Sequence, residues 1–418
     1  MSVVLVSAVD PYPTDAGKKV VLAGFVDYFV QRYGAESVHY VKVGDPPQRA
    51  FPVPVHVVPA PSRAAVLRGI ATRVAVGRAS LQEAFLGSPQ TAAAITQIIS
   101  EIRPRLQVYD TVRMAQYAPS DVAAQQICYL DDLFSERYEG MLRAAKLYPD
   151  VNSSPLGNFA DHVPRRLQPL ADHRISRTAL LRAERVLVRR SEDRAAKAFR
   201  RCLLVNQNET DLLIRRTGVA PGRIVCVPPL FAPRVEVERR YSGGAEFVFL
   251  GLLSLAHNDD GLRWFLRAVW PVMLERIPHA HLRVIGRHAG PELLAMAAEL
   301  RGSVTVEGYV DDLDDAMARA AALINPLRFG SGIKLKVIEA LARAVPVVSS
   351  SIGAEGISSG AGTGILVGAD PAALADLLYS LTDPHRNAEA SADARRHFQA
   401  SYSRAAVFAA YDNAFDLP

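Results

Sequence analysis

Short apolar runs alternate with amphipathic stretches along most of this chain, and this rhythm limits the possible folds more than any other feature. In the second half the runs are "EFVFLGL", "HLRVIG", "SVTVEGYV", "AALINPL" and "PVVSSS". They have strand length, whereas the intervening stretches, such as "GLRWFLRAVWPVMLERI", have helical spacing. In the first half "VVLVSA", "SVHYVKV", "RLQVYD" and "QICYL" repeat the rhythm more weakly. Such alternation indicates βαβ units and parallel sheets, so the predicted class is α/β.

The chain has 418 residues, which is more than one hydrophobic core usually serves. The segment "VPPLFAPRVEVERRYSGGAEF" is rich in proline and glycine and lacks apolar periodicity, as an interdomain linker does. We therefore predict two Rossmann-like domains, at residues 1–226 and 246–395, joined by a linker at 227–245. The apolar tail at 396–418 is predicted to be a helix docked on the body of the protein.

Composition sets limits on the partners and the compartment. The formal charge of +5 favours anionic partners, but no basic tract interleaved with aromatic residues and no zinc-finger spacing indicates nucleic acid binding. The three cysteines are far apart and two lie in apolar runs, which fits buried residues in a reducing cytosol. No apolar run approaches the length needed to span a bilayer, so we predict a cytoplasmic protein.

The segment "RFGSGIKLKVIEALA", residues 328–342, has the features of an anion site. Glycines let the backbone approach a ligand closely, and the helix expected to start near Leu335 or Lys336 offers unpaired N–H groups. Lys334 and Lys336 add positive charge, and the carboxylate of Glu339, one turn into the helix, is suited to the hydroxyls of a ribose.

Spacing alone leaves a second interpretation open. A glycine-rich loop before a helix is often only a tight turn, and Lys336 and Glu339 are spaced as a surface ion pair. The spacing of a Walker A phosphate loop is absent.

Residues around this segment resemble the donor-binding signature of family 4 glycosyltransferases of the GT-B fold, in the branch of bacterial exopolysaccharide-type sugar transferases. The resemblance rests on "PLRFGSGIKLKVIEALA", "PVVSS" and "GAEGI", preceded in family order by "FLGLLSLAHNDDGLRWFLRAVWP", "LRVIG" and "VEGYVDDLDDAMARAAALINPL". It is looser in the first half, where "PYPTDAGKK", "YDTVRMAQYA" and "YLDDLFSERY" are similar to family loops. It implies two Rossmann-like domains whose parallel sheets face each other across a cleft, with the C-terminal helix docked back.

The resemblance also implies a role for individual residues. Glu339 would bind the ribose, the backbone from Gly332 to Lys336 would meet the diphosphate, and Tyr309 with Val310 would pack against the base. Arg328 and Lys334 would neutralise the diphosphate, Gly353 and Glu355 would lie near the donor sugar, and Lys18 would approach from the other domain. The full implied donor-binding set is Gly17, Lys18, Gly286, Tyr309, Val310, Arg328, Gly330, Ser331, Gly332, Lys334, Lys336, Glu339, Gly353 and Glu355.

The implied reaction is retaining transfer of a sugar from a nucleoside-diphosphate sugar to a hydroxyl acceptor, which would be a glycan, a lipid-linked glycan or a natural product. No DxD motif stands out, so we expect no essential metal and no cofactor beyond the co-substrate. Asp131, after the run "QQICYL", and Arg113 are the candidate catalytic residues of the first domain. For Arg113 the alternative is an arginine on a helix surface. The aspartate pairs at 259–260, 311–312 and 314–315 are interpreted as acids at helix starts.

The chain departs from the family pattern at three places. Ser331 stands where many relatives carry the first of two glutamates, and Leu252 stands where a cation often follows the first strand of the second domain. Ala344 stands where a glycine would help to end the helix. The first two departures motivate an alternative function, a non-catalytic GT-B partner subunit that binds or stabilises an active transferase. A sugar-nucleotide epimerase would have a different signature around Glu339.

Two arginine-rich stretches, within residues 62–80 and 164–201, bear on the acceptor side. They are either solvated helix faces or a surface attracted to an anionic membrane or to a lipid-diphosphate acceptor. In the first stretch arginines recur every five residues, which does not place them on one helical face. Peripheral contact with the inner membrane face is therefore the second option for localisation.

Overall fold

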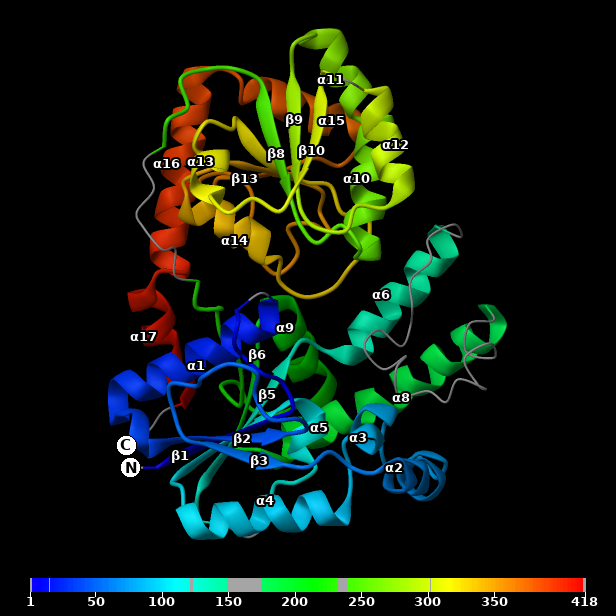
Figure 1. The fold of residues 1–418 in the computed structure, drawn as a ribbon, viewed down its shortest axis with the longest axis vertical. Coiled ribbons are helices and arrows are strands. Elements are labelled where there is room, and N and C mark those ends of the chain that lie inside the picture. Colours follow the sequence, from blue (N-terminus) through cyan, green and yellow to red (C-terminus); the bar gives the residue numbers. More distant parts are fainter. Residues whose placement is uncertain are drawn as a thin grey trace. The chain divides into compact units, whose positions relative to one another are not determined.

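The computed structural model describes residues 2–14, 16–120, 123–148, 174–231, 239–300 and 302–415, with side chains in the long helix α8 described from residue 178. The chain forms two compact units (Figure 1). Among these residues, the N-terminal unit holds 2–142, 174–230 and 407–415, and the C-terminal unit holds 143–148 and 231–406. The predicted linker lies partly outside the described residues. Within the described residues, no helix has the length and apolarity needed to cross a membrane.

The N-terminal unit is built on a seven-stranded sheet in the order β3-β2-β1-β4-β5-β6-β7, and every neighbouring pair is parallel. The strands are β1 (Val3–Ser7), β2 (Val38–Val43), β3 (Val55–Val58), β4 (Leu106–Asp110), β5 (Gln125–Asp131), β6 (Arg201–Leu204) and β7 (Ile224–Cys226). All four runs expected in the first half are strands. They are parallel because helices carry the chain back between them.

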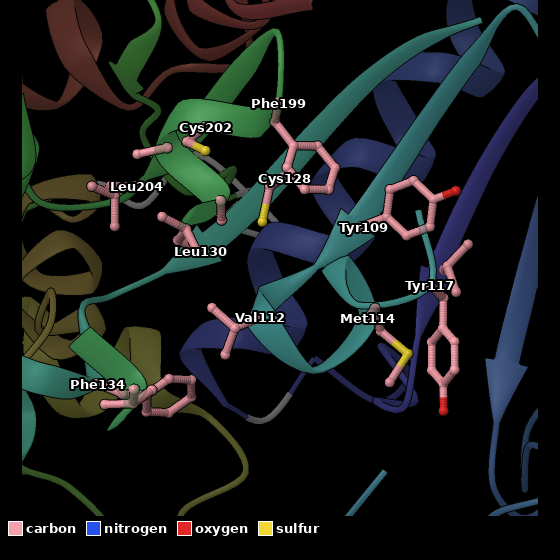
Figure 2. Packing of buried hydrophobic residues seen from close by; sticks show 14 of the residues in the cluster. Tyr109, Val112, Met114, Tyr117, Cys128, Leu130, Phe134, Phe199, Cys202 and Leu204 are labelled. Atoms are coloured by element: carbon pink, nitrogen blue, oxygen red, sulfur yellow. The ribbon is translucent and has the colours of Figure 1, made fainter. Parts of the chain in front are cut away.

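Helices cover both faces of this sheet, which lies between α1 and α4 (Figure 1). The helical segments are α1 (Gly17–Tyr33), η1 (Ala35–Ser37), α2 (Arg63–Gly69), η2 (Ile70–Val74), α3 (Leu81–Phe85), α4 (Pro89–Ile102), α5 (Thr111–Ala115), α6 (Phe134–Leu147), α8 (Arg174–Ala198), α9 (Gln207–Thr217) and α17 (Arg404–Phe415). One core joins strand residues to α4, α8 and α9, and Figure 2 shows Tyr109, Cys128 and Phe199 within it. Cys128 and Cys202 are fully buried, whereas Cys226 is only partly buried.

The last helix, α17, packs on α1 within the N-terminal unit. The ring of Phe415 lies 5.2 Å from that of Phe25 and 4.7 Å from that of Phe29, and Phe415 is fully buried. The hydroxyl of Tyr411 donates to the carbonyl of Pro228 at 3.0 Å. The terminal segment is not one helix, because α16 ends at Ser401 and α17 begins at Arg404. The tail is thus held by aromatic packing, as its composition indicates.

The C-terminal unit is built on a six-stranded sheet in the order β10-β9-β8-β11-β12-β13, again with parallel neighbours. Its strands are β8 (Glu246–Leu250), β9 (His281–Ile285), β10 (Val304–Gly308), β11 (Ala322–Asn325), β12 (Val347–Ser349) and β13 (Ile365–Val367). Its helices are α10 (Ala256–Ala268), α11 (Trp270–Arg276), α12 (Pro291–Glu299), α13 (Leu313–Ala318), α14 (Leu335–Ala342), α15 (Pro371–Ser380) and α16 (Pro384–Ser401). Two cores, one on each face, hold the helices to the sheet. The predicted α/β class with parallel sheets is confirmed.

Ala344 has φ of 53°, in the left-handed region, directly after α14 ends. The prediction that a glycine would suit this position is therefore confirmed by the backbone. A side chain in this region costs about 1 kcal/mol, whereas glycine does not pay it. We expect Ala344→Gly to raise the free energy of unfolding by about 0.5 to 1 kcal/mol. This net value includes the opposing loss of one buried methyl group. Urea denaturation followed by circular dichroism measures this. Ala340→Gly, inside the helix, should destabilise instead, and equal effects of the two variants would contradict the explanation.

Candidate functional site

The carboxyl ends of the strands in the C-terminal unit bring several predicted site residues to one edge of the sheet, where ligands bind in open α/β folds. Gly286 follows β9 directly and packs on the end of β8. A Cβ atom on Gly286 would lie 1.8 Å from the carbonyl oxygen of Gly251. The amide of Gly286 donates to the carbonyl of Gly308 at 2.7 Å. Gly286 is thus required by the close approach of two backbones at this edge of the sheet.

The loop before α14 has the backbone that the sequence predicts. Gly330 has φ of 135° and Gly332 has φ of 69°, so both occupy conformations that favour glycine. The helix begins at Leu335, as expected, with Lys334 as its N-cap. Among the described residues no side chain caps the first turn of α14. Amides at the start of this helix therefore remain available to an anion.

Arg328 does not stand free in this loop. Its Nε donates to Oδ2 of Asp260 at 2.8 Å, and its Nη2 donates to Oδ1 of the same carboxylate. Asp260, on α10, is buried. The pair fixes the loop to α10 in a bidentate geometry, which is the strong form of an arginine–carboxylate contact. Besides lying near the start of α10, Asp260 thus holds the loop through its ion pair with Arg328.

The two lysines of the segment face different surroundings. The amine of Lys334 lies 3.2 Å from the carbonyl oxygen of Ser331 and 2.5 Å from that of Gly332, so it closes the glycine loop on itself. The amine of Lys336 reaches α10 and donates to Oδ1 of Asn258 at 2.7 Å. It also lies 4.4 Å from the centre of the Phe249 ring on β8. Lys334 orders the loop, whereas Lys336 joins α14 to the end of β8.

Glu339 pairs with Arg343 rather than with Lys336. Oε1 of Glu339 lies 3.5 Å from Nη1 of Arg343, one turn along α14. Arg343 also pairs with Asp314 of α13 at 2.7 Å. Burial raises the pKa of the Glu339 carboxyl, and the field of Arg343 acts in the opposite direction. Sequence reasoning missed Arg343, although its i+4 spacing from Glu339 was a visible signal.

Tyr309 and Arg287 form an exposed pair beside this edge. Tyr309 follows β10, is 61% exposed, and carries the guanidinium of Arg287 at 4.0 Å from its ring centre. Arg287 follows Gly286 and was missed by sequence reasoning. Val310 packs partly buried against the core below α14. A flat, exposed arginine–tyrosine pair is suited to stacking against an aromatic ring.

The loop after β12 is tightly packed at Gly353. A Cβ atom there would lie 2.3 Å from the carbonyl oxygen of Asn325 and 2.4 Å from Oγ of Ser349. The side chain of Asn325 donates to the carbonyl of Gly353 at 2.8 Å. Gly353 thus serves backbone packing between β11 and β12, and Glu355 follows in the same turn with its side chain half-buried.

The N-terminal unit gathers a charged cluster at the carboxyl ends of β1, β4 and β5. Gly17 begins α1, and the amine of the next residue, Lys18, lies 2.7 Å from Oδ1 of Asp110. Ser7 donates from Oγ to Oδ2 of Asp110 at 2.6 Å. Sequence reasoning missed Asp110, which ends a strand as Asp131 does. Lys18 is therefore committed to a carboxylate of its own unit.

Two residues beside this cluster have strained backbones. Thr111 and Asp131, which follow or end neighbouring strands, have φ of 63° and 70°. Asp131 accepts a hydrogen bond from the hydroxyl of Tyr129 at 2.7 Å, and burial raises its pKa against the field of Lys18. Positive φ at a β-branched residue is costly, and such strain concentrates at functional sites. Asp131 thus lies in surroundings that suit a functional carboxylate.

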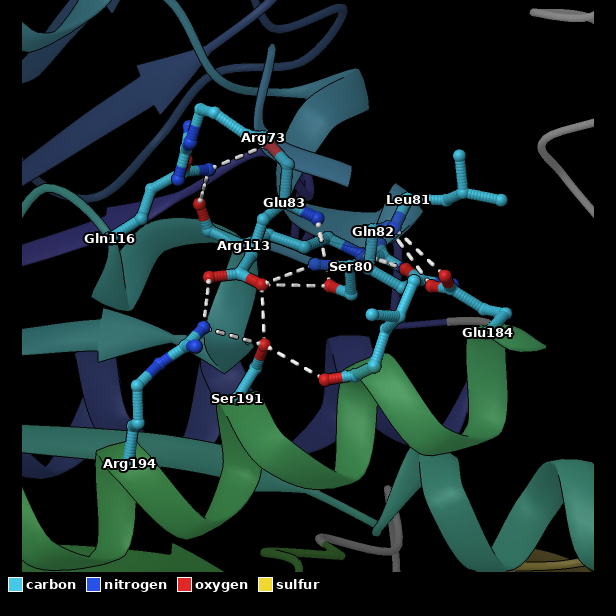
Figure 3. Close-up of polar contacts among 11 residues, drawn as sticks. Arg73, Ser80, Leu81, Gln82, Glu83, Arg113, Gln116, Glu184, Ser191 and Arg194 are labelled. Carbon is cyan, nitrogen blue, oxygen red and sulfur yellow. Dashed lines mark hydrogen bonds and ion pairs between the residues drawn. The ribbon is translucent and has the colours of Figure 1, made fainter. Parts of the chain in front are cut away.

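Arg113 turns towards α3. Its Nε donates to Oε1 of Gln82 at 2.6 Å, its guanidinium lies 5.0 Å from the ring centre of Phe134, and burial lowers its pKa. Figure 3 shows it beside a polar network in which Glu83 and Glu184 hold the start of α3. Arg113 is therefore partly buried and hydrogen-bonded to α3, unlike the solvated helix-surface arginine of the alternative.

Within the described residues, no group of three or more histidine, cysteine, aspartate or glutamate side chains is placed to hold a metal ion. The expectation of a metal-independent reaction stays a prediction. The acids at 312, 314 and 315 behave as interpreted, since Asp312 caps α13 and Asp314 and Asp315 lie in its first turn.

Two parallel-sheet units, one with a glycine loop and an uncapped helix start at the carboxyl edge of its sheet, are the elements of a GT-B fold. Comparison with known proteins agrees: residues 244–383 match the family model of group 1 glycosyl transferases. The match covers about a third of the chain, lies within the C-terminal unit, and agrees with the predicted resemblance to glycosyltransferases.

Solved structures resemble the whole chain at low identity. Sucrose-phosphate synthase (tll1590) from Thermosynechococcus elongatus is 13% identical, with a TM-score of 0.65 over 99% of this chain and 98% of that chain. The Anabaena protein Alr3699/HepE, in complex with UDP, is 13% identical, with a TM-score of 0.64 over 100% of both chains. These likenesses establish the fold.

One curated relative is an uncharacterized 44.6 kDa protein in the cps region of Klebsiella pneumoniae. It is 25% identical over 179 residues, which is 41% of this chain and 45% of the relative. The match thus spans less than half of that protein.

Proposed function

We propose that this protein is a retaining glycosyltransferase that moves a sugar from a nucleoside-diphosphate sugar to a hydroxyl acceptor without a metal ion. The observation that carries the proposal is the glycine loop from Gly330 to Gly332 followed by the uncapped start of α14, with Glu339 one turn further on. This arrangement suits a diphosphate at the helix start and a ribose at the carboxylate. The family match over 244–383 supports it.

The chemistry of the proposed reaction fits this arrangement. When the bond between sugar and diphosphate breaks, negative charge develops on the leaving diphosphate. Fixed N–H groups and cations at that position bind the transition state more strongly than the ground state, and this lowers the barrier. With charge stabilisation supplied by the protein, the reaction does not depend on a divalent ion. Front-face departure and attack would retain the anomeric configuration.

On the acceptor side we place the charged cluster of the N-terminal unit. Asp131 is a partly exposed carboxylate with a raised pKa, and the Lys18–Asp110 pair holds its surroundings in place. A carboxylate of this kind can accept a hydrogen bond from an attacking hydroxyl. The acceptor class that we propose is a glycan or a lipid-linked glycan.

Exposed arginines around α2 and η2 in the N-terminal unit support peripheral contact with an anionic membrane surface. Arg63, Arg68 and Arg78 are exposed around α2 and η2, and Leu67 and Val76 are 59% and 60% exposed. Arg73 does not belong to this surface, because it donates to the side chain of Gln116 at 2.9 Å. Arginines beside exposed apolar side chains suit the headgroup region of a membrane that carries lipid-linked acceptors.

A nucleotide panel tests the proposal. UDP comes first because solved structures of the same fold hold it, followed by GDP, dTDP and ADP. We expect one of them to raise the melting temperature at sub-millimolar concentration, since saturation at 100 times Kd adds about 2.7 kcal/mol. The responding nucleotide then selects the donor sugars for transfer assays with lipid extracts, in the presence and absence of a chelator.

The same nucleotide panel distinguishes the proposed enzyme from the alternative, a non-catalytic partner subunit. Ser331 and Leu252 replace the glutamate and the cation that many relatives carry at these positions. Both replacements would be tolerated in a non-catalytic partner subunit. Such a subunit would bind no nucleotide, or bind one without donor hydrolysis or transfer. Absence of any response across the panel would contradict the proposed enzyme. Loss of transfer with the chelator would contradict the metal-independent mechanism.

A further inference from the structure

Lys336 differs from the other cations of the glycine loop in its partners. The guanidinium of Arg328 is bound to the carboxylate of Asp260, and the amine of Lys334 is bound to carbonyl oxygens of its own loop. The amine of Lys336 contacts the neutral side chain of Asn258 at 2.7 Å. No ion pair in the described part of the chain involves Lys336. Its positive charge is therefore not balanced by a carboxylate.

Asn258 holds the amine in one place. Its side chain is 3% exposed, and its Nδ2 donates to the carbonyl of Leu252 at 2.9 Å, so its Oδ1 is left to accept from Lys336. Gly251 makes room for both groups, because a Cβ there would lie 2.9 Å from Nδ2 of Asn258 and 3.0 Å from Nζ of Lys336. The end of β8 is thus shaped around this amine.

This place matters for the leaving group. The amine lies where the end of β8 meets α14, and the residue that follows Gly251 at this strand end is the apolar Leu252, 42% exposed. A diphosphate at the start of α14 requires positive charge near it. Lys336 brings that charge to the strand end from the helix.

We propose that Lys336, positioned by Asn258, is the cation that contacts the diphosphate of the donor and of the leaving nucleotide, in place of a cation at residue 252. The proposal rests on the proposed function, because it assigns a role within the same donor site. Arg328 and Lys334 then order the loop, and Lys336 contributes the charge that acts on the phosphates.

The protonation state of the Lys336 amine provides a second test of the proposal. Burial, together with the neighbouring ammonium of Lys334, lowers the pKa of Lys336 to about 7. The groups that face it from α10 and β8, Asn258 and Phe249, are neutral. A bound diphosphate favours the charged amine. Binding at pH 8 should therefore take up a proton from the buffer.

The experiment measures calorimetric affinities of wild type and Lys336→Met for UDP, UMP and uridine at pH 8. Methionine keeps the apolar stem, and the melting temperature checks the fold. We expect Lys336→Met to bind UDP about 10- to 100-fold more weakly and uridine unchanged, as loss of a charge-assisted contact implies. Proton uptake, obtained from two buffers of different ionisation enthalpy, should disappear. Lys197→Met, an exposed lysine of α8, is the control with the same change of net charge.

A rescue variant separates contact from structural support. In Lys336→Met, the second change Asn258→Lys places an amine at the same strand end and should recover part of the UDP affinity. Equal UDP affinity of wild type and Lys336→Met would overturn the inference and leave the proposed function standing. Parallel loss of uridine binding would also overturn it, because it indicates a structural role. Failure of wild type to bind any nucleotide of the panel would overturn both.

Discussion

Glu339→Ala is expected to abolish the rise in melting temperature that the selected nucleoside diphosphate causes in the wild type. The carboxylate lies one turn into α14, half-buried, and its one ion pair within the described residues is the loose contact with Arg343. It is therefore free to accept from two vicinal hydroxyls of a ribose. Two hydrogen bonds to a charged acceptor are worth about 3 kcal/mol or more together. Affinity should fall at least about 100-fold.

A calorimetric titration of Glu339→Ala and Glu339→Gln measures this loss. Glu292→Ala is the matched control, because Glu292 is exposed on α12 and pairs with Arg263 and Arg267, with the same change of charge. The free base, which has no ribose, should bind the variants and wild type alike. Unchanged nucleotide affinity in Glu339→Ala would show that the ribose lies elsewhere.

Among glycine-to-alanine substitutions in the C-terminal unit, Gly286→Ala is expected to lower the free energy of unfolding the most. Its Cβ would overlap the carbonyl oxygen of Gly251 at 1.8 Å, and neither backbone can move without breaking the register of β8 and β9. Overpacking of a rigid contact costs about 1 to 3 kcal/mol and more when only backbone can yield. We expect a loss at the upper end of this range or beyond.

Urea unfolding of the purified variant measures the loss. Gly140→Ala is the control, because Gly140 lies in α6 with no atom within 4 Å of an added Cβ. Alanine there should leave stability unchanged or raise it by up to about 1 kcal/mol. A Gly286→Ala variant as stable as Gly140→Ala would contradict the close contact of the two strands.

The local parts of the site could be predicted from the sequence, and the distant partners could not. The start of α14 and the glycine conformations follow from residue types in a short segment. The strain at Ala344 follows from the end of the helix. By contrast, Asp260 meets Arg328 across 68 positions, and Asn258 meets Lys336 across 78. Such pairs depend on how α10 packs, which no local pattern encodes.

The same limit applies in the N-terminal unit. Asp131 was found because it ends a strand, yet Asp110 ends the neighbouring strand and holds Lys18. The order of strands that makes them neighbours is a tertiary property. The prediction that Lys18 contacts a phosphate therefore did not take into account Asp110, whose carboxylate competes for the same amine. Arg343 is different, since its spacing from Glu339 was visible and was overlooked.

The position of α17 has a consequence for biosynthesis. The aromatic cluster that includes Phe25 and Phe29 is completed by Tyr411 and Phe415, so the N-terminal unit takes its last element from the end of the chain. A nascent chain leaves the ribosome with this unit unfinished until the C-terminal unit has been made. Premature termination before residue 407 would thus damage the half of the protein that was translated first.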